Sequence, residues 1–285
     1  MPLHQAGSSP FVKTTSSPDW VFAQMQIELL GPSPMVPSAQ HRNSHRLHHA
    51  LGLLCVHNLR MKPFRCPLCG PSILVQLDKN EIAIRCGRCG ATPIAMSMAS
   101  ALRAEIADLG AAAVYELSAR GPLHRFLQRV SASLVSSQYI AGAIPGSEVG
   151  GVRVEDVQRL TFPASSFDVC TSTEVFEHVP DDRRAFAEIH RVLRPGGVLL
   201  FTVPLMLDAN TRERAAIVDG TLVHFLAPEY HRDPADGHGP VLAFRDYGVD
   251  IVGRLQEAGF SQARIVNPAG VTWFGYRRPV IWAGK

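Results

Sequence analysis

The chain has 285 residues, of which 46% are hydrophobic and 19% are charged, and its formal net charge at pH 7 is +3. This length allows one or two domains with a real hydrophobic core, and so small an excess of positive charge does not argue for nucleic acid as a partner. No apolar run reaches the length of about 18 residues that a membrane-spanning helix needs.

The first 60 residues are rich in Ser, Pro and His and show no sustained hydrophobic periodicity. Such a composition is typical of a disordered leader. Five histidines fall between His41 and His57, so a metal-binding or targeting tract is an alternative. A third interpretation is that translation begins at Met61, in which case residues 1–60 are not translated.

Four of the six cysteines form two C-x-x-C pairs, Cys66 with Cys69 and Cys86 with Cys89. Sixteen residues separate the pairs, which is typical of a structural zinc site with four thiolate ligands and no open position for catalysis. Segments 73–76 and 81–85 are expected to form a hairpin between them. The sequence therefore predicts a zinc ribbon at 61–95, and this use of cysteine favours a reducing, cytoplasmic location.

Beyond the cysteines, short apolar runs of strand length alternate with segments of helical periodicity. We expect helices at 96–109, 123–130, about 180–194 and 247–258. We expect strands at 112–117, 133–137, 152–154, 167–171, 198–203, 263–266 and 280–282. The central strand–helix–strand series is a βαβ unit, and it predicts an α/β domain at 96–285 with a doubly wound sheet.

Three motifs carry a family resemblance. They read LTFP-x-x-SFD from Leu160, EVFEHV from Glu174, and LRPGG from Leu193. In this order and spacing they resemble the class I S-adenosylmethionine-dependent methyltransferases, and more narrowly their small-molecule branch, type 11. The resemblance covers about residues 112–284. It implies a Rossmann-like, seven-stranded sheet with a terminal antiparallel strand, and S-adenosylmethionine as the cofactor.

The resemblance also implies which residues bind that cofactor at the carboxyl ends of the strands. They are Glu116, Ser118, Gly121, Gln138, Asp156, Val157 and Ser172. Glu116, near the end of the first strand, matches the family's acid, but Ser118 and Arg120 stand where the family has glycines. Gln138 stands where an acid usually binds the ribose hydroxyls. Asp156 matches the adenine-binding acid, with a loop or helix-capping aspartate as the alternative. The departures put tight cofactor binding in question.

Two histidines are candidate catalytic bases, because imidazole can take a proton from a hydroxyl near neutral pH. His178 follows Glu177, and its alternative role is to support the loop before the next helix. His231 lies in segment 208–245, where the family places substrate-recognition insertions. Such a long segment without periodicity is typical of a lid or binding loop. The alternative is a polar surface loop without a binding role. Tyr230, Glu229 and Asp233 accompany His231 there.

These features favour an S-adenosylmethionine-dependent methyltransferase that transfers a methyl group to an oxygen of a small-molecule or saccharide-like acceptor. One alternative is an RNA methyltransferase that binds nucleic acid through the zinc ribbon. It is less favoured, because Lys79, Arg85 and Arg88 in the ribbon are balanced by Asp78 and Glu81. Another alternative is a non-catalytic scaffold that has lost the cofactor. The sequence predicts no membrane partner and does not identify the acceptor.

Overall fold

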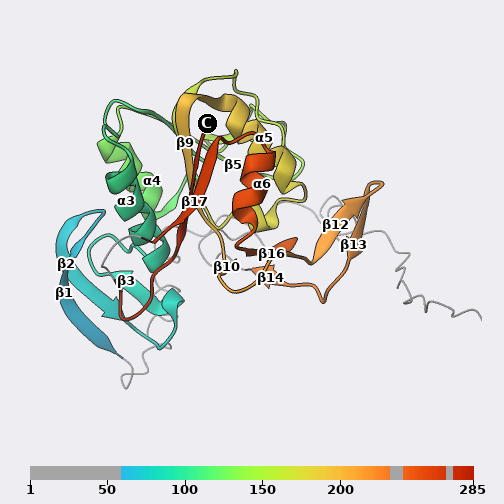
Figure 1. Cartoon of the computed structure of the whole chain (residues 1–285). Helices are drawn as coiled ribbons and strands as arrows, with labels where there is room; N and C mark the ends of the chain where they lie inside the picture. The colour runs from blue at the N-terminus through green and yellow to red at the C-terminus, as the bar shows by residue number, and fades with distance from the viewer. Residues whose placement is uncertain (1–58, 232–239, 268–271) are drawn as a thin grey trace, which may run out of the picture. The chain divides into compact units, whose positions relative to one another are not determined.

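The computed structural model describes residues 59–231, 240–267 and 272–285 (Figure 1). Residues 1–58 of the expected leader therefore lie outside the described residues. No helix within the described ranges is long and apolar enough to cross a membrane.

The first described module is a three-stranded antiparallel sheet in the order β1-β2-β3. Its elements are β1 (Arg60–Cys66), β2 (Gly70–Gln76), the 3-10 turn η2 (Glu81–Ala83) and β3 (Ile84–Cys86). The hairpin expected between the cysteine pairs is present, with β2 paired to β3. Residues 81–83 form a turn instead of strand, because the side chain of Asn80 accepts a hydrogen bond from the backbone N–H of Ala83 at 2.9 Å.

The second module is an eight-stranded sheet in the order β17-β18-β9-β8-β4-β5-β7-β6. Its strands are β4 (Ala113–Glu116), β5 (Ser133–Gln138), β6 (Glu148–Val149), β7 (Val152–Val154), β8 (Phe167–Thr173), β9 (Leu193–Thr202), β17 (Gln262–Val266) and β18 (Val280–Gly284). Five strands pair in parallel, from β7 through β5, β4 and β8 to β9, and β18 is antiparallel to both neighbours. The α/β, doubly wound prediction is confirmed. The eighth strand is β6, a two-residue antiparallel partner of β7.

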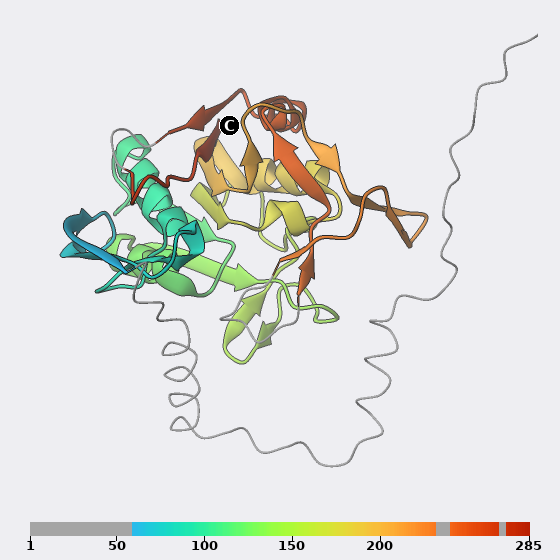
Figure 2. The same cartoon turned by 90° about the horizontal axis from the view of Figure 1, so that it is seen from below.

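Helices cover both faces of this sheet (Figures 1 and 2). They are α3 (Pro93–Glu105), α4 (Gly121–Val130), the 3-10 turn η3 (Phe176–His178), α5 (Asp182–Val192) and α6 (Ile251–Glu257). Successive side chains of a strand point to opposite faces of the sheet, so they pack into the two hydrophobic cores on either side of it. Val169 and Leu200 pack with α3 and α4, whereas Cys170 and Phe201 pack with α5 and α6. The near-continuous apolar strands of the sequence thus reflect burial on both faces.

The ends of two helices differ from the sequence prediction. Helix α3 begins at Pro93, three residues early, because Thr92 caps it with its side chain and proline suits the first turn. Helix α6 begins at Ile251 and not at residue 247, because residues 245–248 form β16 and pair with two strands of the insertion.

The insertion after β9 consists of short strands and turns where the sequence predicted a loop. Its strands are β10 (Leu205–Met206), β11 (Arg212–Glu213), β12 (Ala215–Val218), β13 (Thr221–His224), β14 (Tyr230–His231), β15 (Val241–Leu242) and β16 (Arg245–Gly248). The β12–β13 hairpin extends away from the eight-stranded sheet (Figures 1 and 2). The predicted acceptor-binding residue Asp233 lies outside the described residues.

Candidate functional site

The carboxyl ends of the parallel strands bring most of the predicted cofactor residues to one edge of the sheet. Glu116 ends β4 and Gln138 ends β5, while Asp156 follows β7 by two residues. Glu174 comes directly after β8. In open α/β sheets this edge is where ligands bind, because the helices leave the strands there in opposite directions.

Glu116 is a buried acid at the centre of this edge. Its side chain accepts a hydrogen bond from the hydroxyl of Thr171 on the neighbouring strand, and the residue is 1% exposed. Burial raises the pKa of Glu116 to about 8, because a carboxylate is poorly solvated there, although the Thr171 hydroxyl partly offsets this. A positively charged ligand group at this position would favour the ionised form.

The turn after β4 is shaped by an arginine and a glycine. Arg120 precedes helix α4 and donates from Nε and Nη2 to Oε1 of Gln138, at 3.1 and 2.8 Å. Ser118 donates to the carbonyl oxygen of Arg120 at 3.4 Å. Gly121 has a φ of +87°, which a residue with a side chain rarely adopts. The expected departure at Arg120 therefore has a structural consequence, since its guanidinium contacts the predicted ribose-binding residue.

Asp156 and Val157 form the turn after β7. The Asp156 carboxylate accepts from the backbone N–H of Gln158 at 2.9 Å and from its side-chain amide at 3.1 Å. Val157 is 9% exposed. This geometry fits a loop-stabilising aspartate, and the remaining lone pairs of the carboxylate also suit a donor on a ligand.

Near the end of β8, one arginine forms ion pairs with an acid of the eight-stranded sheet and with an acid of the β1–β3 module. The backbone of Glu174 has a φ of +52°, so its side chain leaves the strand in an unusual direction. Arg278 Nη2 lies 3.4 Å from Glu174 Oε2 and 3.5 Å from Oε2 of Glu81, which belongs to η2. Sequence reasoning did not single out Arg278. In the sequence, the one feature that distinguishes Arg278 is its position just before the last expected strand.

Two hydroxyls near Glu174 are buried without a partner. The side-chain oxygens of Ser172 and Thr202 have no hydrogen-bond partner among the described residues, and both residues are 0% exposed. They lie on the adjacent strands β8 and β9. A buried hydroxyl without a partner is costly, so these two are places where a bound ligand or water would be stabilised.

The two candidate bases are close together. The rings of His178 and His231 lie 4.9 Å apart between centroids, nearly perpendicular. Both histidines lie beside Glu177, which is 1% exposed and whose carboxylate oxygens have no hydrogen-bond partner among the described residues. Burial, together with the charge of Glu174, raises the pKa of Glu177 well above its usual range. Burial lowers the pKa of His178, which favours its neutral form.

Arg245 holds the loop that carries Glu177 and His178. It is 3% exposed and donates to the carbonyl oxygens of Phe176, Val179 and Pro180 at 3.1, 2.5 and 2.7 Å. The backbone carbonyl of Glu177 also accepts from the N–H of Phe244 at 2.7 Å. The β15–β16 part of the insertion therefore fixes the η3 loop.

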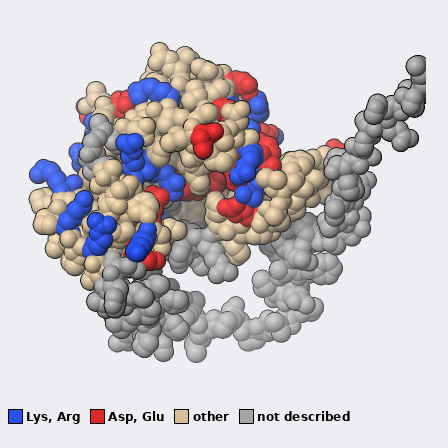
Figure 3. Space-filling view, turned by 60° about the horizontal axis from the view of Figure 1, so that its bottom comes forward, with Lys and Arg blue, Asp and Glu red and all other residues tan. Residues whose placement is uncertain are grey.

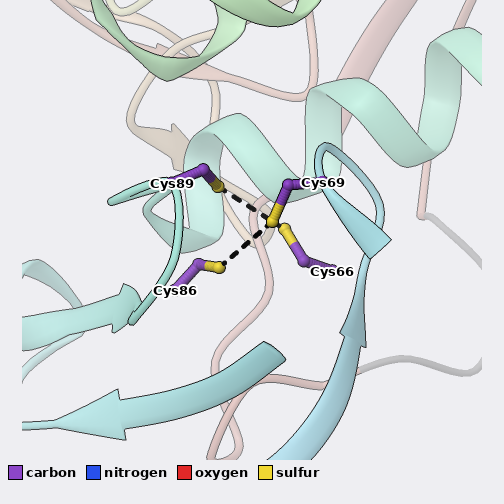
Figure 4. Close-up of side chains that lie close together, drawn as sticks. All are labelled: Cys66, Cys69, Cys86 and Cys89. Carbon is purple, nitrogen blue, oxygen red and sulfur yellow. Dashed lines mark hydrogen bonds between the residues drawn. The ribbon is translucent and has the colours of Figure 1, made fainter. Parts of the chain in front are cut away.

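The four predicted zinc ligands form a second cluster (Figure 4). Cys66 Sγ lies 3.7 Å from Cys89 Sγ, and Cys69 Sγ lies 3.6 Å from Cys86 Sγ. All four sulfurs lie within 4.8 Å of one another. Tetrahedral thiolates around zinc stand about 3.8 Å apart, given Zn–S bonds of about 2.3 Å, so the arrangement can hold such an ion.

Arginines of α3 and α4 contact the cysteine turns. Arg103 donates to the carbonyl oxygen of Pro67 at 3.0 Å, and Arg129 donates to that of Leu68 at 3.2 Å. On the face shown in Figure 3, Lys and Arg side chains form separate patches, most of them on the left of the view. Arg103 and Arg129 thus have structural partners, and on the part of this face that the structure describes the basic patches stay separate.

Part of the eight-stranded sheet is similar in sequence to a known protein family. Residues 112–201 match the family model described as a methyltransferase domain. This segment, about a third of the chain, is therefore similar to a methyltransferase domain. The match spans β4 to β9, which carry Glu116, Gln138, Asp156 and the Glu177–His178 pair.

Individual relatives cover less of the chain. An uncharacterized methyltransferase of Mycobacterium sp. (strain KMS) is 49% identical over 63 residues, which are 21% of this chain and 25% of that protein. A ubiquinone biosynthesis O-methyltransferase of Coxiella burnetii (strain Dugway 5J108-111) is 40% identical over 48 residues, or 17% of this chain and 20% of that protein. The chain thus spans about a quarter or less of the length of these relatives. A crystal structure of an S-adenosylmethionine-dependent methyltransferase from Mesorhizobium loti shares 20% identity, covers 66% of this chain and 98% of its own, and has a TM-score of 0.43.

The raised pKa of Glu116 predicts how stability depends on pH. Between 4.5 and about 8 the folded protein keeps this proton while the unfolded chain releases it. The free energy of unfolding should therefore decrease as the pH rises through this window, more steeply in the wild type than in Glu116→Gln. Denaturant unfolding at a series of pH values measures both slopes. Glu148→Gln, which changes an exposed acid on β6, is the control and should keep the wild-type slope. Equal slopes in wild type and Glu116→Gln would contradict the prediction.

Proposed function

We propose that this protein is an S-adenosylmethionine-dependent methyltransferase that methylates a hydroxyl group of a small-molecule or saccharide-like acceptor. One observation supports the proposal: in the segment that is similar to a methyltransferase domain, Glu116, Gln138 and Asp156 lie at or just after the carboxyl ends of parallel strands. The activity, the acceptor and the residue roles below belong to the proposal.

The cofactor would lie along the carboxyl ends of β4, β5, β7 and β8. Glu116 is suited to the amino group of the methionine moiety, because that cation would stabilise its carboxylate. Asp156 would accept from the exocyclic amine of adenine, beside Val157. Gln138 would bind the ribose, which requires Arg120 to share or release the amide oxygen that it now contacts. Ser172 would bond to the ligand through its buried hydroxyl.

Methyl transfer needs in-line positioning and removal of one proton. Bound S-adenosylmethionine would supply its sulfonium methyl group to the acceptor oxygen, with a C–O bond gained, a C–S bond lost and S-adenosylhomocysteine as the second product. The hydroxyl proton would pass to His178 or His231. Oxygen is favoured as the acceptor atom because imidazoles lie at this edge, and similarity to an O-methyltransferase supports it. Glu229 and Tyr230, next to His231, would contact the acceptor.

We also propose that the four cysteines bind one structural zinc ion. The sulfur spacing supports this, and burial raises the pKa of the Cys66 thiol, so its thiolate would need a cation nearby. The ion would hold β1, β2 and β3 together, and with them Glu81, which forms an ion pair with Arg278.

Loss of the Asp156 carboxylate should weaken cofactor binding. We predict that Asp156→Ala raises the Kd for S-adenosylmethionine by roughly 5- to 150-fold, equivalent to about 1–3 kcal/mol for a lost buried hydrogen-bond partner. Equilibrium dialysis measures the affinity. Asp219→Asn, in the exposed turn between β12 and β13, is the control and should leave the Kd unchanged. An unchanged Kd for Asp156→Ala would show that adenine binds elsewhere.

The zinc proposal predicts a metal content. Purified protein should contain about one zinc ion per chain at the four thiolates, and Cys66→Ser should lose it and become less stable, because thiolate ligation stabilises so small a module. Elemental analysis and thermal unfolding measure these effects. Cys170→Ala changes a buried cysteine of β8 outside the cluster, so it should keep the zinc. Folded wild-type protein without metal at the cysteines would refute the proposal.

The methyl acceptor can be sought with a labelled cofactor. We predict transfer of label from S-adenosylmethionine to small hydroxylated compounds or saccharides. Loss of a general base should lower kcat by about 10²–10⁴-fold in His178→Ala or His231→Ala while cofactor affinity is kept. His224→Ala, an exposed histidine of β13, is the control. Labelling of structured RNA alone would favour the nucleic-acid alternative. Absence of both cofactor binding and transfer would favour a non-catalytic scaffold.

A further inference from the structure

Three metal-ligating side chains converge beside the carboxyl end of β8, outside the four-cysteine cluster. Glu177 and His178 come from η3 and His231 from β14, and one ligand atom of each lies within 4.8 Å of the others. Glu177 Oε1 lies 3.8 Å from His178 Nε2 and 4.0 Å from His231 Nδ1. These separations are too long for hydrogen bonds. An ion with bonds of about 2.1 Å sets its ligand atoms roughly 3.0–3.5 Å apart, so the two distances to Glu177 would contract by about half an ångström on binding.

Hydrogen bonds orient both imidazoles with a lone pair toward Glu177. His178 Nδ1 lies 2.9 Å from the carbonyl oxygen of Leu242, which only accepts, so this nitrogen carries the proton. His231 Nε2 lies 3.3 Å from the Glu229 carboxylate, which also accepts. The nitrogens that face Glu177 are then unprotonated in the neutral rings. Metal-binding histidines are held in the same way, by donation from the other ring nitrogen to a carbonyl or carboxylate.

The third member of the cluster is a buried carboxyl group without a hydrogen-bond partner among the described residues. Glu177 is 1% exposed, and neither carboxylate oxygen has a hydrogen-bond partner among the described residues. The two neighbouring arginines are engaged elsewhere. Arg245 donates to backbone carbonyls of the η3 loop, and Arg278 pairs with Glu81 and Glu174. A cation beside the ionised carboxylate would stabilise it, because an unpaired buried charge is strongly destabilising.

We propose that Glu177, His178 and His231 bind a divalent cation and that its remaining coordination positions face the acceptor. A divalent cation between these three side chains would take up the imidazole lone pairs and balance the charge of the ionised carboxylate. Two imidazoles and one carboxylate suit zinc or manganese better than magnesium or calcium, which prefer oxygen ligands alone.

The role of this cation rests on the proposed methyltransferase function. A hydroxyl group bound to a divalent cation loses its proton far more readily than a free one. The proton would then pass to water, and the two histidines would be ligands and not bases. Methyl transfer itself is unchanged, since the same C–O bond forms and the same C–S bond breaks.

The test is a metal titration of the full chain with its cysteine-bound zinc in place. Calorimetry with Zn²⁺, and electron paramagnetic resonance with Mn²⁺, should each detect one further ion per chain. His231→Ala removes a partly exposed ligand and should weaken this binding at least about 10-fold. Glu177→Gln should do the same, with near-ultraviolet circular dichroism to confirm that it folds. His224→Ala is the matched histidine control and should bind like the wild type.

Two results would overturn the inference. One is wild-type protein that binds neither ion beyond the cysteine site, and the other is binding that His231→Ala and Glu177→Gln leave unchanged. S-adenosylmethionine binding, measured without added metal, separates this inference from the proposed function. If the protein binds the cofactor but not the second ion, the proposed methyltransferase function with histidine bases is retained and the metal site is rejected. Ion binding without cofactor binding leaves a metal site on a protein that is not a methyltransferase.

Discussion

The burial of β4, β8 and β9 on both faces is the constraint on which the rest of the structure depends. Consecutive side chains of these strands enter the two cores on opposite sides of the sheet, so polar groups are tolerated mainly where the strands end. Because the strands are parallel, those ends share one edge. Glu116 and Thr171 pair near this edge, and Glu174 follows β8 there. The hydroxyls of Ser172 and Thr202 lie near the ends of β8 and β9 without hydrogen-bond partners among the described residues. Several buried polar atoms without partners in the described part of the chain thus lie at the edge where ligands bind in open α/β sheets.

Two arginines connect this edge to parts of the chain that lie far away in the sequence. Arg245 binds three carbonyls of the η3 loop and so holds His178 against the insertion. Arg278 pairs with both Glu174 and Glu81, and its backbone N–H donates to the hydroxyl of Ser97 on α3 at 3.1 Å. The β1–β3 module shares a core with α3 as well. Its expected zinc ion would therefore support the position of a side chain at the edge, in addition to its own fold.

Much of the sheet could be predicted from the sequence, because local patterns determine buried strands and the helices between them. Segments 133–137, 152–154 and 263–266 were located to within one residue, and the motifs around Glu174 indicated the order of the central elements. The strands of the insertion could not be predicted in this way, since residues 245–248 become a strand only by pairing with segments 32 or more residues away. The proximity of His178 to His231, like the pairing of Arg278, depends on the tertiary path of the chain, which no local pattern records.

The central claim is that the polar edge of the sheet binds S-adenosylmethionine despite the Arg120–Gln138 contact. Calorimetric titration of the full chain with S-adenosylmethionine and S-adenosylhomocysteine tests it most directly. We expect both ligands to bind at one site per chain and to compete with each other. Absence of heat for either ligand, together with no change in thermal stability at a large excess of ligand, would contradict it.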